Sequence, residues 1–124
     1  MTIVDVYKIV PNWKSLVKSQ LSMFNNYPKD LSEFSVELHN ATWCPDCERE
    51  SSALFAMVES LGGKAPKLKI IGYENIQEYK QLKTSKKLEI SCLPTIIFKN
   101  SNQEAVLSIN EKSNPSFREV INIL

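Results

Sequence analysis

The sequence predicts an α/β fold in which helices flank a central mixed β-sheet. Short apolar segments typical of strands alternate along the chain with segments whose apolar residues recur at helical spacing. The last two strand segments are separated only by Asn100-Ser101-Asn102 and its neighbours, a turn sequence that joins antiparallel strands. Helix-linked strands and an antiparallel hairpin together make a mixed sheet.

The N-terminal third of the chain is expected to hold two strands with a helix between them. Thr2 to Val6 alternate in the manner of a short strand. Asn12 is then a suitable cap for a helix with its apolar residues on one face, and Asn25-Asn26-Tyr27-Pro28 ends that helix. Apolar and polar residues alternate again from 34 to 39, which indicates a strand leading directly into a loop with two cysteines.

The remaining segments continue the alternation of strands and helices. A helix should begin at Pro45, because proline is favoured at the first helical position, and end at Gly62-Gly63. The other expected elements are a buried strand over 67–72, a short helix over 76–82, strands over 95–99 and 105–109, and a final helix from Pro115. Four apolar residues of that final helix share one face: Phe117, Val120, Ile121 and Leu124.

Length and composition describe an ordinary globular protein. The 124 residues are expected to form one domain, residues 1–124, with a single buried core. The net charge is +1, with acidic and basic residues interspersed, so no nucleic-acid or membrane partner is expected. No signal peptide or membrane-length apolar run is visible, and three cysteines are too few for a disulfide scaffold. We therefore expect a cytoplasmic protein that acts as a monomer.

Trp43-Cys44-Pro45-Asp46-Cys47 is the pattern that points to chemistry. With Pro45 at the first helical position, Cys44 becomes the N-cap, and its sulfur can accept hydrogen bonds from unpaired N–H groups of the first turn. The sulfur also lies at the positive end of the helix dipole, and both effects favour the thiolate. Cys47 follows one turn later, where it can close a disulfide. We expect Cys44 to be exposed.

A second pattern, Leu93-Pro94-Thr95, stands at the start of the predicted hairpin. Together the two patterns resemble those of the thioredoxin family, and the resemblance extends from about residue 34 to residue 124. It implies a thioredoxin-like fold with Cys44 as the attacking thiol and Cys47 as the resolving thiol.

The resemblance also implies a substrate-binding region. The Leu93–Pro94 peptide bond would be cis and would lie beside the sulfurs. Because Leu93 keeps its own N–H and C=O, its backbone would pair with an extended stretch of substrate by strand addition. Trp43 would cover one side of the sulfur, and Thr95 would lie in the same region.

The residues between the cysteines depart from the commonest thioredoxin motif, which has Gly-Pro there. Pro45 and Asp46 instead resemble the small cytosolic thioredoxin-related proteins that carry the motif WCPDC. The carboxylate of Asp46 opposes a thiolate at Cys44 through like-charge repulsion. Pro45 and Asp46 are thus expected to modulate the site in favour of a reductant over a strong oxidant. Glu48, Arg49 and Glu50 are expected to be surface charges of the same helix.

The proton acceptor for Cys47 is a second departure. Thioredoxins have a buried Asp six residues before the first cysteine, where this chain has Leu38. Glu37 is the nearest acid, and strand alternation would turn it to the other face of the sheet. Three routes stay open: a local bulge that brings Glu37 to modulate Cys47, a water molecule, or His39.

The expected activity is dithiol exchange that reduces disulfides of proteins or small molecules. A reductase or a thiol pool would return the electrons, and no cofactor is predicted because no nicotinamide or flavin fingerprint is present. One alternative is a glutaredoxin-like enzyme, although the paired glycines expected after Pro94 are missing. Another is a thioredoxin-fold adaptor that binds a partner in its groove without catalysis.

A zinc site is a further alternative, because two cysteines at this spacing also suit a tetrahedral metal. Its four ligands would be Cys44, Cys47, Cys92 and His39. No metal is predicted, since a second paired motif is lacking. Cys92, two residues before Pro94, is either a regulatory thiol or a spectator.

Overall fold

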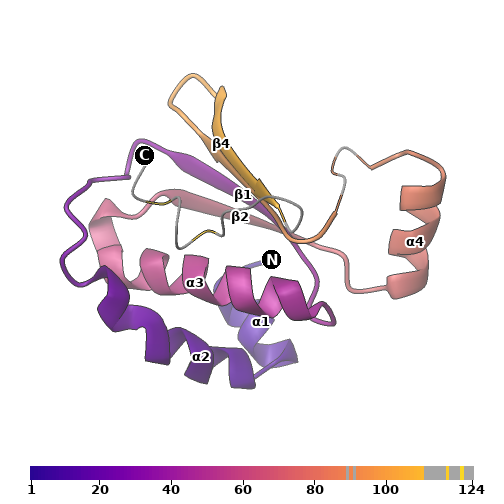
Figure 1. Cartoon of the computed structure of the whole chain (residues 1–124), viewed down its shortest axis with the longest axis horizontal. Coiled ribbons are helices and arrows are strands. Elements are labelled where there is room, and N and C mark those ends of the chain that lie inside the picture. Colours follow the sequence, from indigo (N-terminus) through magenta and orange to yellow (C-terminus); the bar gives the residue numbers. More distant parts are fainter. Residues whose placement is uncertain (89, 91, 111–116, 118–120, 122–124) are drawn as a thin grey trace.

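The computed structural model describes residues 1–88, 90, 92–110, 117 and 121. Within these residues a four-stranded sheet lies against helix α3, and helices α1 and α2 lie on the far side of α3 from the sheet (Figure 1). The helices are α1 (Ile3–Ile9), α2 (Asn12–Gln20), α3 (Pro45–Leu61) and α4 (Ile76–Thr84), with 3-10 turns η1 (Leu21–Phe24) and η2 (Gly62–Lys64). The strands are β1 (Ser35–Asn40), β2 (Lys67–Gly72), β3 (Thr95–Lys99) and β4 (Ala105–Asn110).

The sheet is mixed, with the strand order β2-β1-β3-β4. Strand β1 pairs with β2 in parallel and with β3 in antiparallel, and β3 pairs with β4 in antiparallel. The parallel pair is joined through α3 and the antiparallel β3–β4 pair by a short turn, as the sequence predicts. This arrangement is a thioredoxin-like α/β fold, which confirms the predicted fold class.

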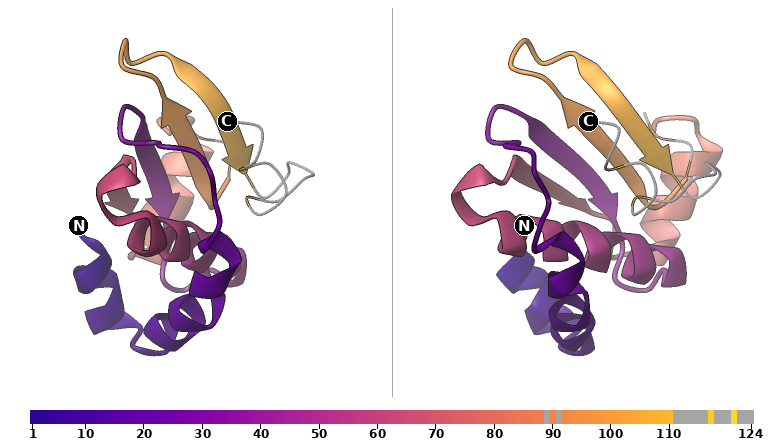
Figure 2. Two further views of the ribbon diagram at one scale, coloured as in Figure 1. Left: turned by 90° about the vertical axis from the view of Figure 1, so that its left-hand side faces the viewer. Right: turned by 60° about the vertical axis from the view of Figure 1, so that its left-hand side comes forward.

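The core lies between α3 and the face of the sheet that α3 covers. The side chains of Leu38, Ile96 and Phe98 on that face are fully buried, as are Leu54 and Phe55 of α3. A second apolar layer separates α3 from α1 and α2, and the views in Figure 2 show those two helices stacked outside α3. Helix α3 is therefore buried from two sides, which holds its N-terminus rigidly against the sheet.

The predicted strand over Thr2 to Val6 is wrong, because these residues begin helix α1. Thr2 Oγ1 accepts a hydrogen bond from the N–H of Asp5 at 3.2 Å, and the Asp5 carboxylate accepts the N–H of Thr2 at 2.8 Å. This reciprocal capping box satisfies two backbone donors at a helix start. Five alternating residues fit either structure, and the cap together with burial of Val6 against the core decides for a helix.

Helix α2 differs from the prediction, because Asn12 is its first residue and not its cap, which is Pro11, and the chain changes at Leu21 to the 3-10 turn η1. The remaining described elements agree with the prediction within one or two residues. Helix α3 begins at Pro45 and ends where Gly62 adopts a φ of 55°, a conformation that glycine reaches without steric cost. The predicted final helix from Pro115 falls outside the described residues, apart from Phe117 and Ile121, which are buried in the core. Within the described ranges, every helix is too short or too polar to cross a bilayer.

The capping box of α1 generates a stability prediction. Replacing Thr2 with Ala removes the acceptor for the Asp5 N–H and should lower the free energy of unfolding by about 1 kcal/mol. Thr2→Ser keeps the hydroxyl and should stay close to the wild type. Urea denaturation of the three proteins measures the difference, and equal losses for both variants would show that the cap adds nothing to stability.

Candidate active site

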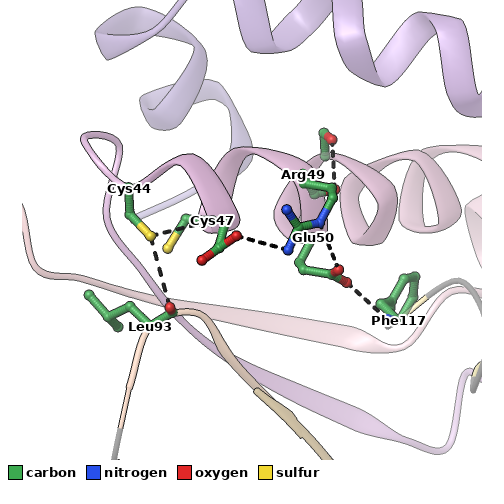
Figure 3. A network of polar contacts seen from close by, with 8 residues as sticks. Cys44, Cys47, Arg49, Glu50, Leu93 and Phe117 are labelled. Carbon is green, nitrogen blue, oxygen red and sulfur yellow. Dashed lines mark hydrogen bonds and ion pairs between the residues drawn. The ribbon is translucent and has the colours of Figure 1, made fainter. Parts of the chain in front are cut away.

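The start of α3 places the two cysteines as the sequence predicts. Cys44 is the N-cap, with an extended backbone (φ −96°, ψ 119°), and Pro45 occupies the first turn. The N–H of Cys47 donates to Cys44 Sγ at 3.3 Å (Figure 3). A backbone donor and the positive end of a 17-residue helix thus face the Cys44 sulfur, and both stabilise a negative charge there.

The two cysteines differ in exposure, and Cys44 is less open than predicted. Cys47 is fully buried, whereas Cys44 keeps 8% of its surface exposed. Leu93 covers part of the Cys44 sulfur. Its carbonyl oxygen lies 3.9 Å from Cys44 Sγ and accepts a hydrogen bond from the thiol (Figure 3). Of the pair, only Cys44 remains in contact with solvent, which suits it to meet a substrate before Cys47 does.

Cys47 lies in an environment that favours its neutral thiol. Burial raises its pKa well above the ordinary value, and the Cys44 sulfur and the Asp46 carboxylate raise it further. The N–H of Ala41, which donates to Cys47 Sγ at 3.5 Å, acts in the opposite direction but does not outweigh burial. Cys47 is therefore protonated at neutral pH and must lose its proton before it can act as a nucleophile.

The structure excludes Glu37 as the direct proton acceptor for Cys47, contrary to one of the predicted routes. Strand β1 pairs with β2 and β3 in unbroken register, so the bulge that would bring Glu37 inward is absent from β1. The Glu37 carboxylate instead contacts His39 Nε2 at 2.7 Å and Lys99 Nζ at 3.1 Å. Both partners hold its pKa below the usual range, against the effect of burial.

The His39 route meets the same obstacle. His39 alternates with Leu38, which is buried under α3, and its ring contacts Tyr73 Oη at 2.8 Å on one side and Glu37 on the other. This geometry also separates His39 from the cysteines with which the alternative zinc site would combine it. Among the described residues, no group of three histidine, cysteine or carboxylate side chains is placed to hold a metal ion. Cys92 is fully buried.

A buried polar pair beside Cys47 escaped sequence reasoning. Ser51, one helical turn after Cys47, donates its hydroxyl hydrogen bond to Asn40 Oδ1 at 2.7 Å, and both residues are fully buried. The Asn40 amide nitrogen has no hydrogen-bond partner within the described part of the chain. Neutral serines and asparagines occur throughout the sequence, so only the three-dimensional packing singles out this pair.

The predicted substrate-binding residues gather at the same end of the sheet. The Leu93–Pro94 peptide bond is cis, as the resemblance implies. Trp43 is 37% exposed, and its indole N–H donates to the Tyr73 carbonyl at 2.8 Å, which directs the ring toward α4. The Thr95 hydroxyl donates to the carbonyl of Cys92 at 2.7 Å and is thus engaged within the protein.

The first two turns of α3 carry a chain of charges that runs away from the cysteines. Arg49 forms an ion pair with Asp46 at 2.9 Å and with Glu50 at 3.3 Å. Glu50 was expected on the surface but is buried, because its second carboxylate oxygen accepts the backbone N–H of Phe117 at 2.9 Å (Figure 3). The partner that buries Glu50 lies 67 residues away, beyond the reach of a local pattern.

Comparisons with known proteins concern the fold and do not identify the chemistry of the site. No protein-family model matches the chain, and no curated protein matches it. A protein of unknown function from Pseudomonas aeruginosa is 16% identical, with a TM-score of 0.51 over 99% of this chain and 86% of that one. An HIV epitope-scaffold is 14% identical, with a TM-score of 0.51 over 99% and 87%.

A disulphide isomerase from Xylella fastidiosa has a TM-score of 0.40, with 17% identity over 77% of this chain and 71% of that one. At such identities the two likenesses with a TM-score of 0.51 concern the fold alone. Together, the fold and the helix-capping Cys44–Cys47 pair define a thioredoxin-like α/β protein with a dithiol at the start of α3.

The burial of Cys47 predicts a pH dependence of stability in the reduced protein. Unfolding exposes the thiol and returns its pKa to about 8.5, so above that pH the unfolded state ionises while the folded state keeps the proton. The stability contributed by Cys47 is thus fully present below about pH 8.5 and declines at higher pH, by up to about 1.4 kcal/mol per pH unit. Urea denaturation between pH 7 and 10 should show a steeper decline for wild type than for Cys47→Ser; parallel curves would contradict this.

The hydrogen bond between Ser51 and Asn40 should contribute to stability, and it can be removed without changing the charge of the protein. Ser51→Ala leaves the buried Asn40 oxygen unpaired and should lower the free energy of unfolding by about 1–3 kcal/mol. Ser85→Ala is the matched control, because that hydroxyl is exposed. Equal stabilities of the two variants, measured by denaturant midpoints, would mean that the pair contributes nothing net.

Proposed function

We propose that this protein is a thiol–disulfide oxidoreductase of the thioredoxin family that reduces disulfides of proteins or small molecules. The observation that carries the proposal is the hydrogen bond from the Cys47 N–H to Cys44 Sγ at the start of α3. It combines a helix N-terminus, a thiol placed to become a thiolate, and a second thiol within one turn. These are the requirements for dithiol exchange.

In the first step the Cys44 thiolate attacks one sulfur of the substrate disulfide. A bond forms between Cys44 Sγ and that sulfur, the substrate S–S bond breaks, and the other substrate sulfur leaves as a thiolate that takes up a proton. The N–H of Cys47 supports the attack because it stabilises negative charge on Cys44 Sγ. The 8% exposure of Cys44 makes it the point of entry.

In the second step Cys47 loses its proton and attacks Cys44 Sγ. The protein disulfide forms, and the second substrate sulfur leaves as a thiolate and is protonated. The substrate has then gained two electrons and two protons. The Cys44–Cys47 pair supplies both electrons and the proton of Cys47, and water supplies the second proton, in place of the one that Cys44 released when it became a thiolate. Because burial favours the protonated Cys47, this step needs a proton acceptor, and we assign that role to water or to the departing substrate thiolate.

The surface around Leu93 is proposed to hold the substrate. The backbone of Leu93 would pair with an extended substrate stretch, with Pro94 and Thr95 beneath it and Trp43 at the rim. A thiol pool or a reductase would then reduce the protein disulfide. We propose that the protein works as a monomer in a reducing compartment such as the cytoplasm, where a Cys-x-x-Cys pair can cycle.

Reduction of insulin by dithiothreitol, followed as turbidity, tests the proposal. The wild type should accelerate precipitation well above the rate of dithiothreitol alone, and Cys44→Ser should return it to that rate. Cys92→Ser is the matched control, since it removes a buried cysteine outside the pair and should retain activity. Cys47→Ser should stop after the first step and accumulate a mixed disulfide, visible by mass spectrometry.

Equal rates for wild type and Cys44→Ser would contradict the proposal. They would favour the adaptor, in which the same surface binds a partner and the cysteines do not exchange.

A further inference from the structure

The negative charge of Asp46, close to Cys44, is paired with a positive charge. Its carboxylate lies in the first turn of α3, two residues from the sulfur whose thiolate the site has to stabilise. Arg49, three residues further on, places Nη2 2.9 Å from Asp46 Oδ1 (Figure 3). An ion pair at this spacing neutralises much of the field that the carboxylate would otherwise direct at the sulfur.

Arg49 is itself held from the other side. Its Nε lies 3.3 Å from Glu50 Oε1, and the Glu50 carboxylate is buried and anchored by the backbone N–H of Phe117. The guanidinium therefore spans a fixed buried anion and the more exposed Asp46. An exposed ion pair alone is worth little, because two long side chains must be ordered to make it. Here the buried Glu50 supplies part of that ordering.

We propose that Arg49 is a positioning residue, held by Glu50, that orients and neutralises Asp46 and thereby stabilises the Cys44 thiolate. The inference rests on the proposed dithiol function and adds a determinant of its redox equilibrium. Because the thiolate belongs to the reduced form, any loss of its stabilisation shifts the equilibrium toward the Cys44–Cys47 disulfide.

The test compares Arg49→Gln, Asp46→Asn, the double variant and Lys69→Gln with the wild type. Lys69→Gln is the matched control, because it also removes one positive charge but lies on β2 opposite Glu37, on the side of the sheet away from α3. Arg49→Lys keeps the charge and should recover part of the wild-type behaviour. Two readouts are used at low salt: equilibration of the Cys44–Cys47 pair with glutathione buffers, and the rate of Cys44 alkylation by iodoacetamide in a background with the other two cysteines replaced by Ser.

Arg49→Gln should shift the glutathione equilibrium toward the disulfide by about threefold, or about 14 mV at 29.6 mV per tenfold change. Asp46→Asn should shift it about as far toward the dithiol, and Cys44 alkylation should slow in the first variant and quicken in the second. In the Asp46→Asn background Arg49 has lost its target, so Arg49→Gln should have a smaller effect. Raising the salt concentration should reduce all of these differences.

The proposal is overturned if Arg49→Gln behaves like Lys69→Gln in both readouts. It is also overturned if its effect is equally large in the Asp46→Asn background, because Arg49 would then act as a general charge and not through Asp46. If the wild type forms no Cys44–Cys47 disulfide in any glutathione buffer, the proposed function fails, while the alkylation rates still decide the role of Arg49. Thermal melting checks that each variant is folded. If Arg49→Gln is unfolded, the same two readouts for Arg49→Lys and Asp46→Asn decide the role of Arg49 instead.

Discussion

The N-cap of α3 is the constraint on which the site and much of the fold depend. Pro45 disfavours a helical conformation for the residue before it, so Cys44 is extended and the chain turns sharply out of β1 into the helix. Cys44, which ends the loop, also accepts a hydrogen bond from the N–H of Cys47 through its sulfur. A helix buried against the sheet on one side and against α2 on the other cannot shift its start, and the distance between the two cysteines is set with it.

The first turn of α3 satisfies two electrostatic demands that conflict. Acidic side chains such as Asp46 and Glu48 stabilise a helix N-terminus through the macrodipole, yet each opposes a thiolate at the cap. Arg49 stands where both demands can be met, because it neutralises Asp46 without occupying the end of the helix itself. The buried Glu50 ties this surface balance to the core and to the segment that contains Phe117. Charge at the site and packing of the fold are therefore linked through one carboxylate.

Sequence reasoning succeeded where a signal was local and strong. Pro45 and Gly62 mark both ends of α3, and the turn after residue 99 marks the β3–β4 hairpin. It failed for residues 2–6, whose alternation predicted a strand. Thr2 and Asp5 form a capping box there, and the segment begins a helix. Sequence reasoning could not foresee the burial of Glu50 or the Asn40–Ser51 pair, because their partners come from distant segments and their residue types carry no distinctive pattern. Local periodicity predicts elements, whereas the polar contacts of a core depend on how those elements meet.

The placement of the two tryptophans has an optical consequence. Trp13 lies in the core with 1% of its surface exposed, whereas Trp43 precedes Cys44 and has its indole fixed by the Tyr73 carbonyl. Emission from Trp13 thus forms a constant background, and any spectral change on oxidation of the dithiol originates from the indole at the rim. The chain consequently carries a built-in fluorophore that reads the charge and bonding of the adjacent sulfur, without an added label.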